Sequence, residues 1–184
     1  TGVLTLTRGI LITSPTNLLT VSPFVAPPLG AIPSTATPPT THGSYVAGPM
    51  RINFPATGTA ARNFPLGVGT AFNGPVPNAN VRKTLTIATT TAWASQTILA
   101  SIQPAPSGVA NPPLTRIMGT RAYRLDLLGG PDLPATATLT MRGMNYTWGG
   151  GSGSDSLLGT QAGLRVAQSP ALAGPWTERS VSVG

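Results

Sequence analysis

The chain has 184 residues, with 11 Lys or Arg, four Asp or Glu, one His and no Cys. Acid/base groups, metal ligands and activated nucleophiles come mostly from Asp, Glu, His and Cys, so this composition disfavours an enzyme and predicts no bound cofactor or metal. The net charge of +7 comes from basic residues that stand singly, apart from Arg82 and Lys83, without a phosphate-binding loop or base-stacking motif. We therefore expect a solvated, mildly cationic surface and no dedicated nucleic-acid binding.

The turn-forming residues are unusually frequent, since Gly supplies 22 positions and Pro supplies 20. Short runs in which aliphatic residues alternate with Thr recur between these breaks, and no segment shows a helical period. A chain of this length is able to bury a proper core, and hydrophobic residues make up 40% of it. We predict an all-β protein, namely a β-sandwich with a short strand-rich N-terminal segment. No apolar run reaches the roughly 18 to 20 residues of a membrane helix, so we expect no membrane insertion.

The N-terminal segment covers residues 1–21. Alternation over residues 3–7, 10–13 and 18–21, with a turn at Ser14-Pro15-Thr16-Asn17, predicts short stacked rungs or a hairpin. Residues 22–42 contain six Pro, which cannot donate to a strand ladder, so this stretch is predicted to be an extended loop or linker.

The predicted sandwich covers residues 43–184. Alternation of Thr with aliphatic residues is clearest in residues 83–88 and 135–141, as a half-buried strand requires. The predicted strands of the sandwich are residues 45–52, 62–69, 81–90, 96–103, 115–127, 135–142, 163–169 and 177–183.

Several short motifs follow one another along the chain, namely Gly2–Gly9, Ile12-Thr13, Asn17–Val21, Gly43–Arg51, Asn63–Gly69, Thr120–Leu125 and Thr136–Met141. Their order resembles the repeat modules of large bacterial surface proteins that the type IX secretion system exports. The resemblance implies an extracellular or cell-surface β-sandwich module of an adhesin-like or filament-forming protein, with no catalytic residues to carry over. The Pro-rich stretch before His42 departs from that pattern.

The two ends of the chain suggest a contact between copies. Residues 180–184 followed by residues 1–7 form one alternating run, as in a tandem repeat or in a subunit that completes its neighbour. We expect head-to-tail contact of the chain with copies of itself, with residues 1–21 packing on an adjacent unit; the alternative is two ordinary terminal strands. The expected assembly residues are Val3, Leu4, Leu6, Ile10, Ile12, Val181 and Val183.

Three tryptophans leave a second function open. Trp93, Trp148 and Trp176 would stack on sugar rings if they were clustered and exposed, which would give a carbohydrate-binding sandwich with surface polysaccharide as partner. Buried core aromatics are the other interpretation. A capsid-type jelly roll is a third class, although the first ten residues carry only Arg8 and so lack a basic arm.

Two short motifs suggest glycan attachment. Asn145 begins an Asn-Tyr-Thr acceptor pattern, and Ser156 lies in an Asp-Ser-Leu sequence similar to the O-glycosylation motif of bacteria that use this secretion route. Ser156 is preferred because it follows a Gly/Ser turn. Asp126 and Asp132 flank another turn, but calcium needs six to eight oxygens, so these carboxylates are interpreted as turn caps.

Overall fold

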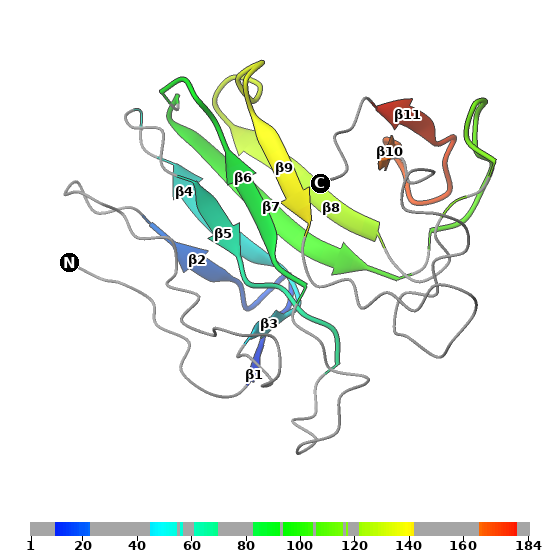
Figure 1. Cartoon of the computed structure of the whole chain (residues 1–184). Helices are drawn as coiled ribbons and strands as arrows, with labels where there is room; N and C mark the ends of the chain where they lie inside the picture. Colours follow the sequence, from blue (N-terminus) through cyan, green and yellow to red (C-terminus); the bar gives the residue numbers. More distant parts are fainter. Residues whose placement is uncertain are drawn as a thin grey trace, which may run out of the picture. The chain divides into compact units, whose positions relative to one another are not determined.

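The computed structural model describes residues 10–22, 45–54, 56, 61–69, 83–92, 94–104, 106–115, 117, 122–141 and 166–179 (Figure 1). This part of the chain is all-β, as predicted, with eleven strands and no helix. Accordingly, the described residues include no helix long and apolar enough to cross a membrane.

The strands form two larger sheets and two strand pairs. The larger sheets have the orders β2-β4-β7-β8 and β5-β6-β9, and the pairs are β1-β3 and β10-β11. The strands are β1 (Ile10–Ile12), β2 (Leu19–Val21), β3 (Tyr45–Ala47), β4 (Met50–Phe54), β5 (Arg62–Phe64), β6 (Leu85–Ala88), β7 (Gln96–Gln103), β8 (Ala122–Gly129), β9 (Thr138–Met141), β10 (Val166–Gln168) and β11 (Thr177–Arg179).

The chain divides into two compact units, residues 1–102 with 124–143 and residues 103–123 with 144–184. Most of the expected linker and the first nine residues lie outside the described residues. The expected boundaries at residues 21 and 42 therefore stay predictions.

Strict alternation of buried and half-buried residues builds the core of the first unit. Met50, Ile52 and Phe54 of β4 are buried, while the residues between them are half-buried. Ile98 lies opposite Ile52 in the register of β7 and is also buried. Because successive side chains of a strand point to opposite faces, each sheet turns one apolar face inward.

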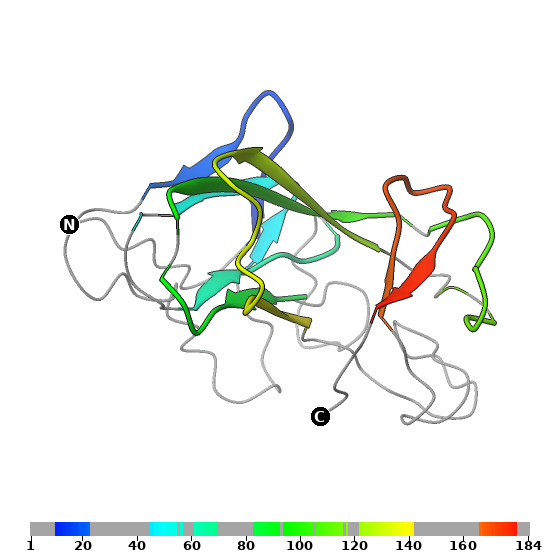
Figure 2. The same cartoon turned by 90° about the horizontal axis from the view of Figure 1, so that it is seen from above.

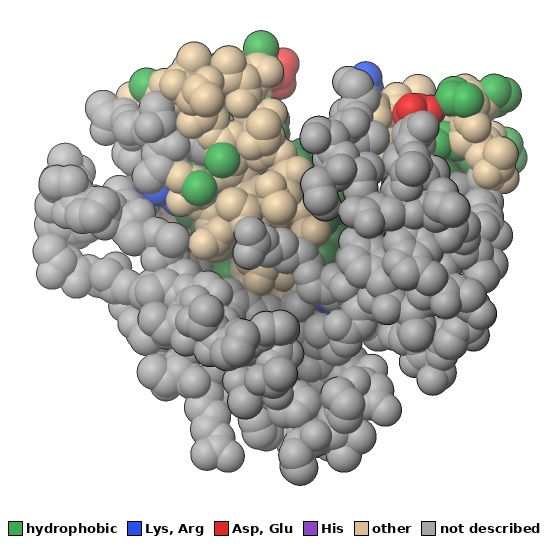
Figure 3. All heavy atoms as spheres, in the orientation of Figure 1, with side chains coloured by type: hydrophobic (Ala, Val, Ile, Leu, Met, Phe, Trp, Pro, Cys, Tyr) green, Lys and Arg blue, Asp and Glu red, His purple; other side chains and the backbone are tan. Residues whose placement is uncertain are grey.

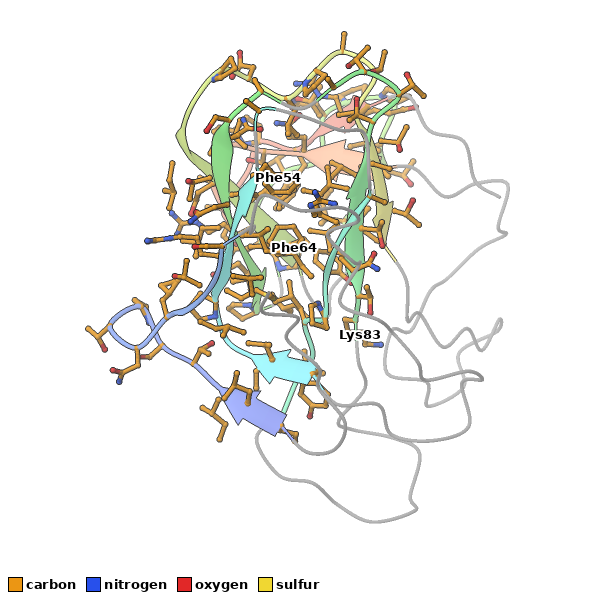
Figure 4. All side chains as sticks on the ribbon, turned by 90° about the vertical axis from the view of Figure 1, so that its left-hand side faces the viewer. Phe54, Phe64 and Lys83 are labelled. Atoms are coloured by element: carbon orange, nitrogen blue, oxygen red, sulfur yellow. The ribbon has the colours of Figure 1, made fainter. Side chains whose placement is uncertain are left out.

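The tripeptide Asn-Phe-Pro occurs at residues 53–55 and again at residues 63–65. Both Phe side chains are buried, and Figure 4 shows them between strands of the two larger sheets. Each Asn accepts a hydrogen bond from a Thr hydroxyl on the neighbouring strand, at 3.1 Å from Thr97 and at 2.7 Å from Thr86. The same local sequence therefore places a core aromatic and an outer polar link in both sheets.

Two basic residues are buried in the first unit, which corrects the expectation of a wholly solvated basic surface. Arg62 is 7% exposed and Lys83 is fully buried. The Arg62 guanidinium lies 5.9 Å from the centroid of the Phe54 ring, so β5 of one sheet contacts β4 of the other. Burial lowers the pKa of Arg62, although a guanidinium keeps its charge in proteins.

The second unit is organised around Trp176. This side chain is buried, and its indole N–H donates to the carbonyl of Ser107 at 2.9 Å. Its backbone N–H donates to the carbonyl of Val109, and residue 110 pairs with it in a parallel bridge. β10 and β11 form an antiparallel pair in which the Arg179 Nε donates to the Gln168 Oε1 at 2.7 Å.

Each predicted strand of the sandwich overlaps a strand of the structure, but the bounds differ. The predicted strand 62–69 ends at Phe64, and the strand predicted over residues 115–127 is β8, which begins at Ala122 and ends at Gly129. The expected strand 45–52 is divided into β3 and β4 by Gly48 and Pro49, because Gly48 has a φ of 127° and cannot continue the strand. Residues 10–13 and 18–21 do not form a hairpin with each other, since β1 pairs with β3 and β2 pairs with β4.

Ile87 and Leu139 lie opposite each other in the register of β6 and β9, yet Ile87 is fully buried and Leu139 is 46% exposed. Replacing Ile87 by Ala should lower the free energy of unfolding by about 2–4 kcal/mol because it leaves a cavity. The matched Leu139→Ala change should cost less than about 1 kcal/mol. Urea unfolding of both variants measures the difference, and equal losses would contradict this placement of the core.

Candidate assembly site

The N-terminal strands lie along a second segment of the same chain in parallel. β1 pairs with β3, from Ile10 opposite Tyr45 to Ile12 opposite Ala47, and β2 pairs with β4 in the same sense. β2 and β4 lie side by side in both cartoon views (Figures 1 and 2). We call residues 10–22 the N-terminal segment and residues 45–53 the docking strands. Each segment consists of two strands with a break between them, after Ile12 in the N-terminal segment and after Ala47 in the docking strands. Because Ile12 and Ala47 are register partners, the two breaks begin at the same position of the ladder.

Thr13 fixes the register of this contact. Its hydroxyl donates to the carbonyl of Pro49 at 2.7 Å, and its backbone N–H donates to the carbonyl of Ala47 at 3.0 Å. A Cβ at Gly48 would overlap the Thr13 backbone and hydroxyl, so a glycine is required there for space as well as for its positive φ. At the far end of the contact, the Asn53 Nδ2 donates to the Ser22 Oγ at 2.9 Å.

The turn between β1 and β2 is found as predicted. The backbone N–H of Asn17 donates to the carbonyl of Ser14 at 3.1 Å, and the reverse bond measures 3.2 Å. The Ser14 hydroxyl also accepts from the Asn17 N–H at 3.0 Å. These local bonds close the turn at residues 14–17, because Ser and Asn satisfy turn backbone groups readily.

Tyr45, the first residue of the docking strands, links them to residues 67–69. Its side chain is buried, its hydroxyl lies 2.9 Å from the carbonyl of Val68 and 3.1 Å from that of Gly69, and burial raises its pKa. Its ring lies so close to Gly67 that a Cβ there would overlap it. Backbone bonds from Val46 to the carbonyl of Pro65 and from Gly67 to the carbonyl of Val46 complete the link.

The N-terminal segment exposes apolar side chains. Ile12 is 60% exposed and Leu11 is 39% exposed, whereas Ile10 is half-buried. Of the expected assembly residues, only Ile10 and Ile12 fall in the described ranges. Val3, Leu4, Leu6, Val181 and Val183 lie outside the described residues.

The remaining candidates are not brought into one site by the described residues. Trp176 is buried, which agrees with the alternative of a core aromatic, while Trp93 and Trp148 lie outside the described residues. Asn145 and Ser156 also lie outside them.

The charged side chains that are described do not gather. Asp126 forms an ion pair with Arg124 on β8, with 2.8 Å between the Arg124 Nε and a carboxylate oxygen. Within the described ranges there is no group of three or more His, Cys, Asp or Glu that could hold a metal ion. On the face shown in Figure 3, the described basic and acidic side chains are few and scattered.

Sequence reasoning missed the contacts of Thr13, Gly48, Tyr45 and Gly67. A signal was present, because Gly48 and Gly67 interrupt apolar runs, and an isolated Gly in a strand pattern indicates a close approach of another part of the chain. The sequence does not indicate which segment makes that approach.

Comparisons of the chain with protein-family models, with curated proteins and with solved structures find no match.

Replacing Gly67 by Ala should destabilise the first unit by about 1–3 kcal/mol, because the buried Tyr45 ring has no room to move away from the added methyl group. The control is Gly129→Ala on β8, where no atom lies within 4 Å of the added Cβ, and its cost should stay within about 0.5 kcal/mol. Thermal unfolding compares the two. A Gly67→Ala variant as stable as the control would contradict the close packing of the Tyr45 ring.

Replacing Thr13 by Val keeps the side-chain shape but removes the hydroxyl that donates to Pro49. The lost bond should weaken the docking of the N-terminal segment by about 1 kcal/mol, which corresponds to roughly fivefold faster amide exchange in residues 10–21. Thr20→Val, at an exposed position on β2, is the matched control and should leave these exchange rates unchanged. Similar exchange in both variants would show that the Thr13 hydroxyl does not hold the segment.

Proposed function

We propose that the chain is a non-enzymatic structural module of a bacterial cell surface, which associates head-to-tail with copies of itself and so forms an adhesive or fibrous array. The supporting observation is an uncharged outer edge that carries exposed apolar residues. Leu19, Thr20 and Val21 form β2, the edge strand of the four-stranded sheet, and Leu11 and Ile12 are exposed on the preceding β1.

The two edges of this sheet differ in how well they are protected. An edge strand presents unpaired N–H and C=O groups, and charged residues on it discourage the addition of another strand. β8, at the opposite edge, carries the exposed Arg124–Asp126 ion pair. β2 carries no charge, so strand addition is favoured on the side of the N-terminal segment.

We also propose that the two larger sheets of the first unit form a β-sandwich. Each sheet has one face of alternating buried residues, and the contact between Arg62 and Phe54 links one sheet to the other. Such an arrangement binds its strands by backbone hydrogen bonds and apolar packing, which suits a structural role. The motif resemblance to type IX-exported surface modules supports an extracellular location for it. The carbohydrate-binding alternative gains no support from Trp176, which is buried.

Deletion of residues 1–21 tests the proposal. The full chain should show a sedimentation-derived mass that rises with protein concentration, whereas the truncated chain should keep its strand-rich circular dichroism spectrum and stay monomeric. A truncated chain that still assembles, or a full chain that is monomeric at high concentration, would overturn the proposal.

A point-variant pair gives the same test without a deletion. Ile12→Ser should weaken assembly because it removes an exposed apolar contact of the N-terminal segment. Val109→Ser is the matched control, since Val109 is 72% exposed in the second unit, and it should assemble like the unchanged chain. Equal weakening of assembly by both changes would indicate non-specific association through exposed apolar side chains, and it would contradict the proposed role of the N-terminal segment.

A further inference from the structure

We propose that the N-terminal segment is exchanged between copies, so that residues 10–22 of one chain occupy the docking strands of the next chain. This inference rests on the proposed head-to-tail association and names the surfaces that meet. The occupant is a second copy of this chain, and the site it fills is formed by β3 and β4.

The hydrogen bonds that hold the N-terminal segment are able to form in the same way within one chain or between two chains. The hydrogen bonds from Thr13 go to Ala47 and Pro49, and that of Ser22 comes from Asn53. All three partners lie beyond residues 23–44, so no bond in this set depends on both strands belonging to the same molecule. Exchange of an identical element keeps every such bond, which makes it a low-cost route to association.

The connecting stretch is long enough for exchange. Residues 23–44 provide 22 residues, which reach at most roughly 75 Å when extended. A compact unit of about 100 residues has a radius of gyration of only about 13 Å. Six Pro in the stretch favour extended conformations over a tight return of the chain, because Pro-rich linkers act as semi-rigid spacers.

Exchange of this kind explains the head-to-tail direction. Each copy would donate its N-terminal segment to one neighbour and receive a segment from the other, so the two contacting surfaces differ. Such a heterologous contact continues as an open array unless the rotation between copies closes a ring.

The absence of Cys from the sequence allows a disulfide test on the full chain. Arg51 lies on β4 between two register partners, Thr20 on β2 and Leu99 on β7. Directly opposite strand residues are close enough for a disulfide bond. We would prepare Thr20→Cys with Arg51→Cys in one chain and, as the matched control, Arg51→Cys with Leu99→Cys. Both pairs use position 51, but only the first pair includes the N-terminal segment.

After oxidation, the Thr20→Cys/Arg51→Cys chain should run as a ladder of covalent oligomers on a denaturing gel. The Arg51→Cys/Leu99→Cys control should run as a monomer with an internal bridge. An equimolar mixture of the Thr20→Cys and Arg51→Cys single variants should give a covalent dimer containing one of each. The corresponding mixture of Arg51→Cys and Leu99→Cys should give none above background.

The exchange would be overturned if the Thr20→Cys/Arg51→Cys chain gave internally bridged monomers and no covalent oligomers at concentrations where sedimentation shows assembly. That result would leave the proposed function intact. Internally bridged monomers together with no assembly in sedimentation would overturn both. A strand-rich circular dichroism spectrum checks the folding of each variant, and the Arg51→Cys/Leu99→Cys bridge shows in addition that β4 and β7 are paired in the control.

Discussion

The packing of the Tyr45 ring over Gly67 is the contact on which the rest of the first unit depends. Through it, β3 is tied to residues 64–69, and the backbone N–H of Lys83 continues the link from the carbonyl of Leu66 towards β6. β1 is in turn paired with β3, so the same contact indirectly supports the N-terminal segment. Because close-packed interiors transmit small displacements, a single added methyl group at Gly67 would be felt along this chain of neighbours.

The positions of the strands were predictable because the sequence alternates Thr with aliphatic residues and breaks at Gly and Pro. Their partners were not. Alternation gives the period of a strand but does not say which other strand it meets, and the parallel pairing of β2 with β4 joins residues about 30 positions apart. The division at Gly48 was missed because alternation does not reveal the positive φ of this residue or the close approach of Thr13, which is distant in sequence.

The buried basic residues show the limit of composition as a guide. Eleven basic residues against four acidic ones predicted a solvated cationic surface, yet Arg62 and Lys83 lie inside the first unit. Their position follows from the strand period, since Arg62 stands two residues before the buried Phe64 and therefore on the same face. The long aliphatic part of an Arg or Lys side chain is able to pack as an apolar group, and the Arg62 guanidinium lies 5.9 Å from the centroid of the Phe54 ring.

The parallel direction of the N-terminal ladder has a mechanical consequence. A pulling force that runs along β1 and β2 is parallel to β3 and β4, so it shears the interstrand hydrogen bonds together instead of opening them one after another. Forced separation is governed by the rate of crossing the unfolding barrier, and a ladder loaded in shear must lose several bonds in one step. The Thr13 hydroxyl bond to Pro49 lies between the two strand pairs and would break in that same step.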